Sequence, residues 1–465
     1  MRFLVAALVL TMGLHTTASA QDSIPVLKGK LTLSISKGTL EGHFTLSNIP
    51  RLNDYVIRLN SGLNVRYFRN LDANVLIYYD KSHYDSLAYE TTAYYFPGNK
   101  GKGKFLPKAV EFSYVGAFPV VRDTISNYSV DDWKGNIAFN GYSIRSDGRQ
   151  SAWYPVLYDS RRDVVYDKVK YDIEVECADC NTLYVNGNVP VRGRKAQFRS
   201  DQPRELTLYC GSFNTVNRND TYFLNPDLSP EALKQFGTLI NGYKQFYEKN
   251  LGIAYKDKIT FIQTTPVSKN NAWLFVSYPT IVNIGWGDYG MKMFMDKKRG
   301  DWFKPYMAHE LGHYYFGTYK KFNAELGDMM SEGFSEFLSF KVTRALISDS
   351  IYVQKIRGKI KSLKEFTPVP FSKVRSVNDY NDRELYVYYY APLLFTAIEK
   401  EIGEPAMWNW MKAILETPAD YTNYAFLTQT LKNTLKDDKK TEAIKARYFE
   451  TDKAIGNAME TIGIK

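Results

Sequence analysis

Residues 302–337 read WFKPYMAHELGHYYFGTYKKFNAELGDMMSEGFSEF and carry the most informative pattern in the chain. Within them, His309, Glu310 and His313 spell H-E-x-x-H, and Glu332 follows after eighteen further residues. Two histidines four positions apart on a helix differ by about 40° around its axis, so both imidazoles can reach one ion. The stretch therefore predicts two consecutive helices that bring metal ligands together.

The residue types in this stretch fit a catalytic zinc site. Such a site has three protein ligands and keeps a fourth position open for water. His309 and His313 supply two ligands, and Glu332 on the next predicted helix is a natural third. Glu310 projects to one side of the first histidine, where its carboxylate can take a proton from water. One zinc ion per chain is therefore expected.

The alternative is a helix whose histidines only cap it or pack against neighbours. The chain has five histidines, and no other two share this spacing. His15 falls in a predicted signal peptide, whereas His43 and His83 are isolated in strand-like sequence. The second helix also carries its glutamate at a fitting distance, which favours a true metal site.

Length and composition restrict the possible classes of protein. A chain of 465 residues is too long for one core, so two or three domains are expected. The 36 tyrosines gather in strand-like runs such as Tyr94-Tyr95-Phe96, typical of half-buried sheet faces. The net charge of +10 is scattered over the chain. No basic stripe with interspersed aromatic residues is present, so nucleic acid is not an expected partner.

Residues 1–20 have the pattern of a secretory signal peptide. Arg2 gives a positive start, Phe3–Leu14 an apolar core, and Ala18–Ala20 a small-residue cleavage site before Gln21. The protein is therefore predicted to be exported, to the periplasm or the medium. No later run of eighteen apolar residues predicts a transmembrane segment.

Three cysteines, Cys177, Cys180 and Cys210, remain in the predicted mature chain. In an exported protein a disulfide is the expected use of such residues. Cys177–Cys180 is the local pairing, and Cys210 could instead pair with either one.

The hydrophobic periodicity changes about halfway along the chain. Residues 21–215 alternate in short runs separated by turn residues, which predicts a β-rich domain formed by a twisted sheet or sandwich. Residues 216–465 predict a second, α+β domain. Its first helix should begin after Ser229, with Pro230 in the first turn. Strand-like segments follow at Lys258–Thr264 and Ala272–Ile284. Helices are then expected at 303–317, 328–346, 351–361, 385–402, 404–415, 422–434 and 438–462.

The zinc-site motifs resemble those of the gluzincin metallopeptidases of the aminopeptidase N and leukotriene hydrolase type. That family has H-E-x-x-H, eighteen residues, then glutamate. His313–Gly317 (HYYFG) is similar to its H-x-W-F-G, and Ser331–Phe334 (SEGF) resembles its N-E-G-F. The resemblance implies a thermolysin-like catalytic domain in which His309, His313 and Glu332 bind zinc. It also implies that Glu310 is the general base.

Two more residues are assigned roles less directly. The family's tyrosine that donates to the oxyanion matches Tyr388, fifteen residues before Gly403, although the lysine and glycine of that pattern are missing. The alternative is a helix that merely packs its tyrosines, since Tyr386, Tyr389 and Tyr390 are neighbours. Glu336, one turn beyond Glu332, could hold a ligand histidine through its free N–H or could face solvent.

One departure from the family concerns substrate choice. Its aminopeptidases have Gly-x-Met-Glu-Asn about thirty residues before the zinc helix, and that glutamate pairs with the substrate's amine. Residues 270–275 read NNAWLF, without glutamate. The predicted strand Val276–Ile284 is still expected to pair with an extended peptide.

The sequence therefore predicts an exported zinc peptidase acting on peptides or proteins, with its exo- or endopeptidase action and its oligomeric state left open. A zinc hydrolase of a non-peptide substrate is one alternative. A non-catalytic binding protein with structural zinc is the other.

Overall fold

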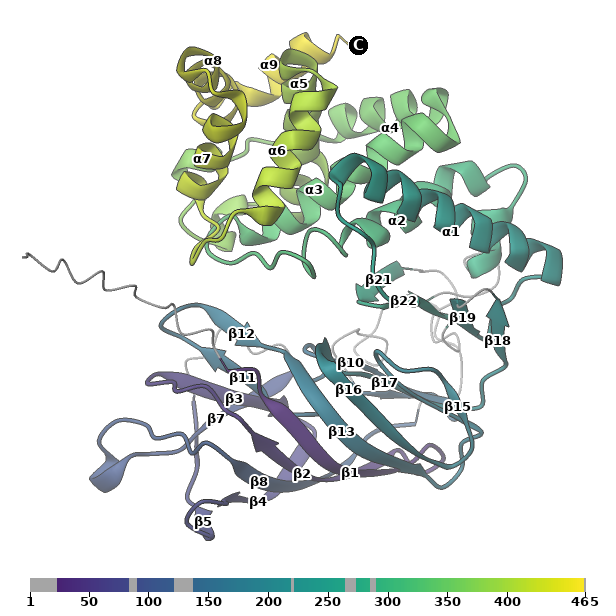
Figure 1. Ribbon diagram of the computed structural model, residues 1–465, viewed down its shortest axis with the longest axis vertical. Helices are drawn as coiled ribbons and strands as arrows, with labels where there is room; N and C mark the ends of the chain where they lie inside the picture. The colour runs from purple at the N-terminus through teal and green to yellow at the C-terminus, as the bar shows by residue number, and fades with distance from the viewer. Residues whose placement is uncertain are drawn as a thin grey trace, which may run out of the picture.

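The structure, a computed structural model, describes residues 23–82, 90–120, 137–218, 221–263, 273–284 and 290–463. A β-rich N-terminal half is followed by a small sheet and a largely helical C-terminal half (Figure 1). This order confirms the predicted fold class. The predicted signal peptide lies outside the described residues.

The largest sheet of the N-terminal half has seven strands in the order β16-β13-β1-β2-β8-β4-β5. Along β13, each second residue from Val169 to Cys177 is buried, as expected for a strand with one face on the core. Parallel pairing of β1 with β13 joins the start of the domain to its end. The strands are β16 (Lys195–Glu205), β13 (Lys168–Cys177), β1 (Val26–Ser34), β2 (Thr39–Ser47), β8 (Val110–Ala117), β4 (Leu63–Asn70) and β5 (Val75–Ile77).

Two five-stranded sheets complete the β-rich half, and Trp153 is buried in its core. The Trp153 indole donates to the Leu206 carbonyl at 2.7 Å, so its one polar group is satisfied. One sheet contains β15 (Val191–Arg192), β14 (Thr182–Val185), β17 (Thr207–Gly211), β10 (Ser143–Asp147) and β9 (Ala138–Phe139). The other contains β12 (Val164–Tyr166), β11 (Val156–Asp159), β3 (Tyr55–Asn60), β7 (Thr91–Tyr95) and β6 (Asp80–Lys81).

A fourth sheet precedes the zinc-motif helices, and its order is β18-β19-β20-β22-β21. The sequence predicted one strand over Ala272–Ile284, and this prediction is wrong. Pro279 has no N–H to donate to a ladder, and the chain reverses there to form a hairpin. One edge strand of the sheet is therefore β21, whereas β22 is internal. The strands are β18 (Thr215–Arg218), β19 (Thr221–Leu224), β20 (Thr260–Gln263), β21 (Trp273–Ser277) and β22 (Thr280–Ile284).

The remaining chain forms helices that pack on this sheet and on one another. Helix α1 begins as predicted, because Ser229 Oγ accepts from Ala232 N at 3.2 Å. The predicted helix 438–462 is interrupted near Thr451, whose hydroxyl accepts from Lys453 N at 3.2 Å and so competes with helical bonding. The α-helices are α1 (Pro230–Leu251), α2 (Gly300–Gly312), α3 (Gly327–Val342), α4 (Asp349–Ser362), α5 (Ala391–Ile402), α6 (Glu404–Glu416), α7 (Tyr424–Leu435), α8 (Asp438–Ile444) and α9 (Ala454–Ile462).

The two halves are joined by apolar packing and by buried polar contacts. Tyr184 and Tyr209 pack with Ile262 and Val282 of the fourth sheet. The Asn186 side chain donates to the Ser277 carbonyl at 2.9 Å, at the start of the β21–β22 turn. These contacts place the fourth sheet between the β-rich half and the helices (Figure 1).

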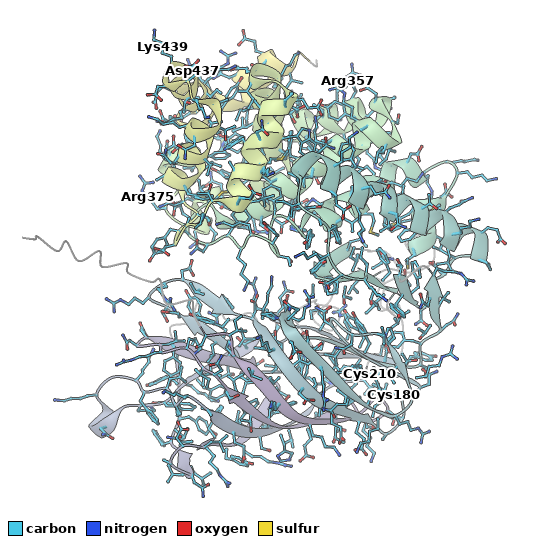
Figure 2. All side chains as sticks on the ribbon, viewed as in Figure 1. Cys180, Cys210, Arg357, Arg375, Asp437 and Lys439 are labelled. Carbon is cyan, nitrogen blue, oxygen red and sulfur yellow. A yellow bond between two sulfur atoms is a disulfide. The ribbon has the colours of Figure 1, made fainter. Side chains whose placement is uncertain are left out.

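Cys177 and Cys180 form the disulfide, so the local pairing holds, and Cys210 is a buried free thiol. Figure 2 shows Cys180 and Cys210 within the β-rich half, away from the helices. Within the described part of the chain, none of the helices is long and apolar enough to cross a membrane.

Candidate metal centre

The two zinc-motif helices approach each other closely where the candidate ligands lie. His309 and Glu310 are in the last turn of α2, and His313 caps its C-terminus with helical dihedral angles. A Cβ atom on Gly312 would lie 3.2 Å from the Ser335 Cα atom of α3. Glycine at this position therefore lets α3 come near enough to present Glu332 to the two histidines.

Three potential ligand atoms converge at this contact. The Nε2 atoms of His309 and His313 are 3.1 Å apart, and Glu332 Oε2 lies 3.4 Å and 3.2 Å from them. Ligands about 2.0–2.1 Å from a tetrahedral zinc ion are themselves roughly 3.3 Å apart. The triangle therefore has the size of one face of a zinc coordination tetrahedron.

The hydrogen bonds of each imidazole leave its Nε2 atom available. His309 Nδ1 lies 2.9 Å from the Glu336 carboxylate, and His313 Nδ1 lies 3.2 Å from the Phe316 carbonyl. Both oxygens are acceptors, so in the neutral imidazoles each Nδ1 carries the proton and each Nε2 presents a lone pair. The Ser335 hydroxyl also lies 3.1 Å from His313 Nδ1. Glu336 thus contacts a ligand histidine rather than solvent.

The burial of the Glu332 carboxylate indicates that the triangle of candidate ligand atoms is suited to a positive charge. Its Oε2 atom is buried without a hydrogen-bond partner among the described residues. A buried carboxylate oxygen facing two imidazole lone pairs is costly unless a cation or protons separate them. The residues present therefore fit a zinc ion, with His309, His313 and Glu332 as its ligands.

The charges around His309 favour a cation at this point. Burial by itself lowers the pKa of an imidazole, but the carboxylates of Glu332 and Glu336 outweigh it and raise the pKa of His309 to about 10. The pKa of Glu332 is held well below its usual range, because the two histidines outweigh its burial. The site is built to hold positive charge, which a divalent metal supplies.

Two cations hold the glutamates from outside the triangle. Lys359 of α4 lies 2.7 Å from Glu336 Oε1. Arg383 makes two 2.7 Å hydrogen bonds to Asp328 and lies 3.4 Å from Glu332 Oε1. These contacts leave the other oxygen of each glutamate for the metal side of the site. Neither cation was predicted from the sequence, because neither lies close to the motif in the chain.

Tyr388 is the tyrosine that faces the histidines. Its ring centroid is 5.7 Å from that of His309. The neighbouring tyrosines are otherwise engaged: Tyr386 donates to the Val369 carbonyl at 2.7 Å, and the Tyr389 ring lies under the Lys359 ammonium. Burial raises the pKa of Tyr388, so its hydroxyl keeps the proton that it would donate.

A local break in helical bonding orients Tyr388. Residues 385–390 form the π-helix η8 (Leu385–Tyr390), which runs directly into α5. Pro392 has no N–H, so the Tyr388 carbonyl four residues earlier cannot accept the usual α-helical hydrogen bond, and it accepts from Lys359 Nζ at 2.7 Å. A Cβ atom on Gly333 would lie 3.0 Å from the Ala391 Cβ atom, so glycine there lets α5 pack against α3. The predicted helix 385–402 is thus a π-turn followed by an α-helix.

Comparison with solved structures shows which fold carries this site. The M1 zinc metallopeptidase of Deinococcus radiodurans superposes with a TM-score of 0.59 and 13% identity, over 93% of this chain and 94% of that one. A mutant of that enzyme bound to a Tyr-Ser-Ala substrate gives 0.60 and 12%, over 91% and 93%. Native LTA4 hydrolase from yeast gives 0.57 and 12%, over 91% of this chain and 66% of that one. No protein-family model and no curated protein matches the sequence.

These similarities show that the chain has the fold of the M1 zinc metallopeptidases. The expected resemblance is therefore confirmed at the level of the fold. The region expected to lack the amine-binding glutamate is only partly described, since residues 270–272 lie outside the described residues and 273–275 belong to β21.

Proposed function

We propose that this protein is a zinc-dependent peptidase that hydrolyses peptide bonds. The observation that carries the proposal is the triangle of His309 Nε2, His313 Nε2 and the buried Glu332 Oε2. Three protein ligands are typical of catalytic zinc, whereas structural sites have four. The fold of zinc metallopeptidases supports the same assignment.

Each residue near the triangle has a defined chemical role in this proposal. When bound, zinc polarises the scissile carbonyl and lowers the pKa of water to about 7. Glu310, buried one residue after the first ligand, takes a proton from the attacking water and passes it to the leaving amine. Tyr388 donates a hydrogen bond to the oxygen on which negative charge develops. Glu336 and Lys359 keep His309 in its ligating tautomer.

Export of the protein belongs to the same proposal and rests on the sequence alone. A peptidase outside the cytoplasm is consistent with the disulfide between Cys177 and Cys180. Mass spectrometry of protein secreted by its host would give an N-terminus at Gln21 if the signal peptide is cleaved as predicted.

Replacing the general base tests the function directly. We expect Glu310→Gln to bind one zinc per chain and to lose peptide cleavage by at least about 10²-fold, because general-base catalysis contributes on that scale. Zinc content and digestion of a peptide library would be measured on the same preparations. Full cleavage by this variant, or native protein that holds no zinc after zinc loading, would refute the proposal.

A further inference from the structure

A cation beside the candidate metal centre has two aromatic partners. The Lys355 ammonium on α4 lies 4.6 Å from the Trp302 ring centroid and 4.7 Å from that of Tyr306. Among the described residues, no carboxylate forms an ion pair with it. The neighbouring cations differ, because Lys359 is paired with Glu336 and Arg383 with Asp328.

The aromatic partners belong to the same helix face as the metal ligands. Trp302, Tyr306, His309 and His313 fall within an arc of about 60° around α2. Their contact with one lysine places both rings on one side of the helix. Trp302 is 39% exposed and Tyr306 50% exposed, so this face remains open beside the candidate ligands.

The distance along α2 matches a short length of bound peptide. His309 lies about 4.5 Å beyond Tyr306 along the helix axis and about 10 Å beyond Trp302. An extended peptide advances about 3.3 Å per residue. A group bound at Lys355 would therefore belong to a residue within about three positions of the bond at the metal.

The surroundings of Lys355 destabilise its charged form, which a bound anion would stabilise. Burial, opposed by the charge of Glu336 and assisted by that of Lys359, lowers the pKa of Lys355 to about 8. A partly desolvated ammonium without a carboxylate is unfavourable, and an incoming carboxylate would relieve that cost.

We infer that Lys355, together with Trp302 and Tyr306, forms a subsite that binds a carboxylate of the peptide substrate close to the cleaved bond. The inference rests on the proposed peptidase function and names its substrate class. The carboxylate is either an Asp or Glu side chain or the peptide's own C-terminus. The rings pack on the adjacent residue and fix the stem of Lys355.

Short alanine-based peptides with a free amine and an amidated C-terminus would test the side-chain source. Each carries one glutamate or one glutamine, moved through all positions, and a second set has a free C-terminal carboxylate instead. Binding would be measured by calorimetry on Glu310→Gln protein with and without zinc, and kcat/KM on protein with Glu310 intact. We expect about tenfold preference for the carboxylate in one of the two sets.

Variants of residues on α4 would show whether Lys355 causes the preference for carboxylate-bearing peptides. Lys355→Met keeps the stem between the rings and should reduce the ratio of carboxylate-bearing to neutral peptides to about one, and Lys355→Glu should lower this ratio below one. Arg357→Met, on the same helix at the outer surface of the helical half (Figure 2), should leave the ratio unchanged.

The inference is overturned if the native chain shows no carboxylate preference, if it binds none of the peptides, or if Lys355→Met retains the ratio. Cleavage that persists in Glu310→Gln would instead refute the proposed function, and the binding ratios would still be readable.

Discussion

Glu336 and Lys359 form a buried ion pair directly behind the His309 imidazole, with Oε1 and Nζ 2.7 Å apart. The same ammonium donates to the Tyr388 carbonyl at 2.7 Å. One cation therefore orients a metal ligand on α2 through Glu336 and holds the backbone of the tyrosine on η8. Both groups would shift if the lysine were lost.

Lys359→Met should weaken zinc binding by about 10–100-fold and lower kcat more than it raises KM. The reason is that Glu336 would lose its cation while Tyr388 would lose its backbone anchor. Competition with a chromophoric chelator measures zinc affinity, and peptide hydrolysis gives kcat and KM. Lys359→Arg should retain part of the zinc affinity and part of kcat. Arg357→Met should change neither zinc affinity nor kcat. Unaltered zinc affinity in folded Lys359→Met protein would contradict the prediction.

Tyr388→Phe should lower kcat by about 10²–10³-fold with little change in KM or zinc content, because a donor aimed at the developing oxyanion acts mainly in the transition state. Tyr389→Phe is the matched control, since its ring stays under Lys359 and its hydroxyl is not assigned a role. Steady-state kinetics on both variants would measure the two changes in kcat and KM. Equal losses in the two variants would mean that packing, not the Tyr388 hydroxyl, is responsible.

Zinc should stabilise the folded protein, because its three ligands are brought together only by folding. At a free zinc concentration of 100 times Kd the gain is about 2.7 kcal/mol. For residues 216–465, which contain the site, this gain corresponds to a rise in Tm of roughly 5–10 °C. Thermal scans of chelator-treated protein with and without added zinc would show it. Glu332→Ala should respond much less, and an equal response would exclude Glu332 as a ligand.

The Asp167–Lys321 pair should make stability depend on pH, because it links the β-rich half to the loop between α2 and α3 at 2.8 Å. Burial alone would raise the pKa of Asp167, but Lys321, Arg149 and Lys168 lower it to about 2. Since this pKa is below the unfolded value near 4, the unfolded chain binds more protons between these pH values. The pair therefore stabilises the fold above about pH 4, and this stabilisation is lost as the pH falls towards 2.

Lys321→Met should cost about 1 kcal/mol or less at pH 7, because Lys321 is half-exposed. The difference in the free energy of unfolding from the native chain should shrink as the pH falls below 4. Urea unfolding at neutral and acidic pH would measure it, and a difference that stayed constant over this range would argue against the assigned pKa.

Local spacing was sufficient to predict that the three candidate ligands come together. His309 and His313 share a helix face wherever that helix forms, and Glu332 follows at a distance that one short connection can close. The start of α1 was equally predictable, since Ser229 and Pro230 act on their own helix. Long elements without a Pro or a competing side chain were predicted to within a few residues at most ends.

Elements that depend on one backbone group were less predictable. The hairpin at Pro279 and the helix break at Thr451 were read as continuous segments, because apolar periodicity continues through both. The π-turn of η8 depends on Pro392 and on a lysine donor from another helix.

The sequence by itself determined the β-rich order of the first half, the two zinc-motif helices and the three candidate ligands, because these follow from periodicity and from helix geometry. Tertiary structure alone decided which of four tyrosines faces the histidines and which cations hold Glu332 and Glu336. It also placed Lys355 against Trp302 and Tyr306, with no ion pair to an acidic side chain in the described part of the chain. Such contacts join residues 23 to 79 positions apart, and their distances are fixed by helix packing rather than by any local pattern.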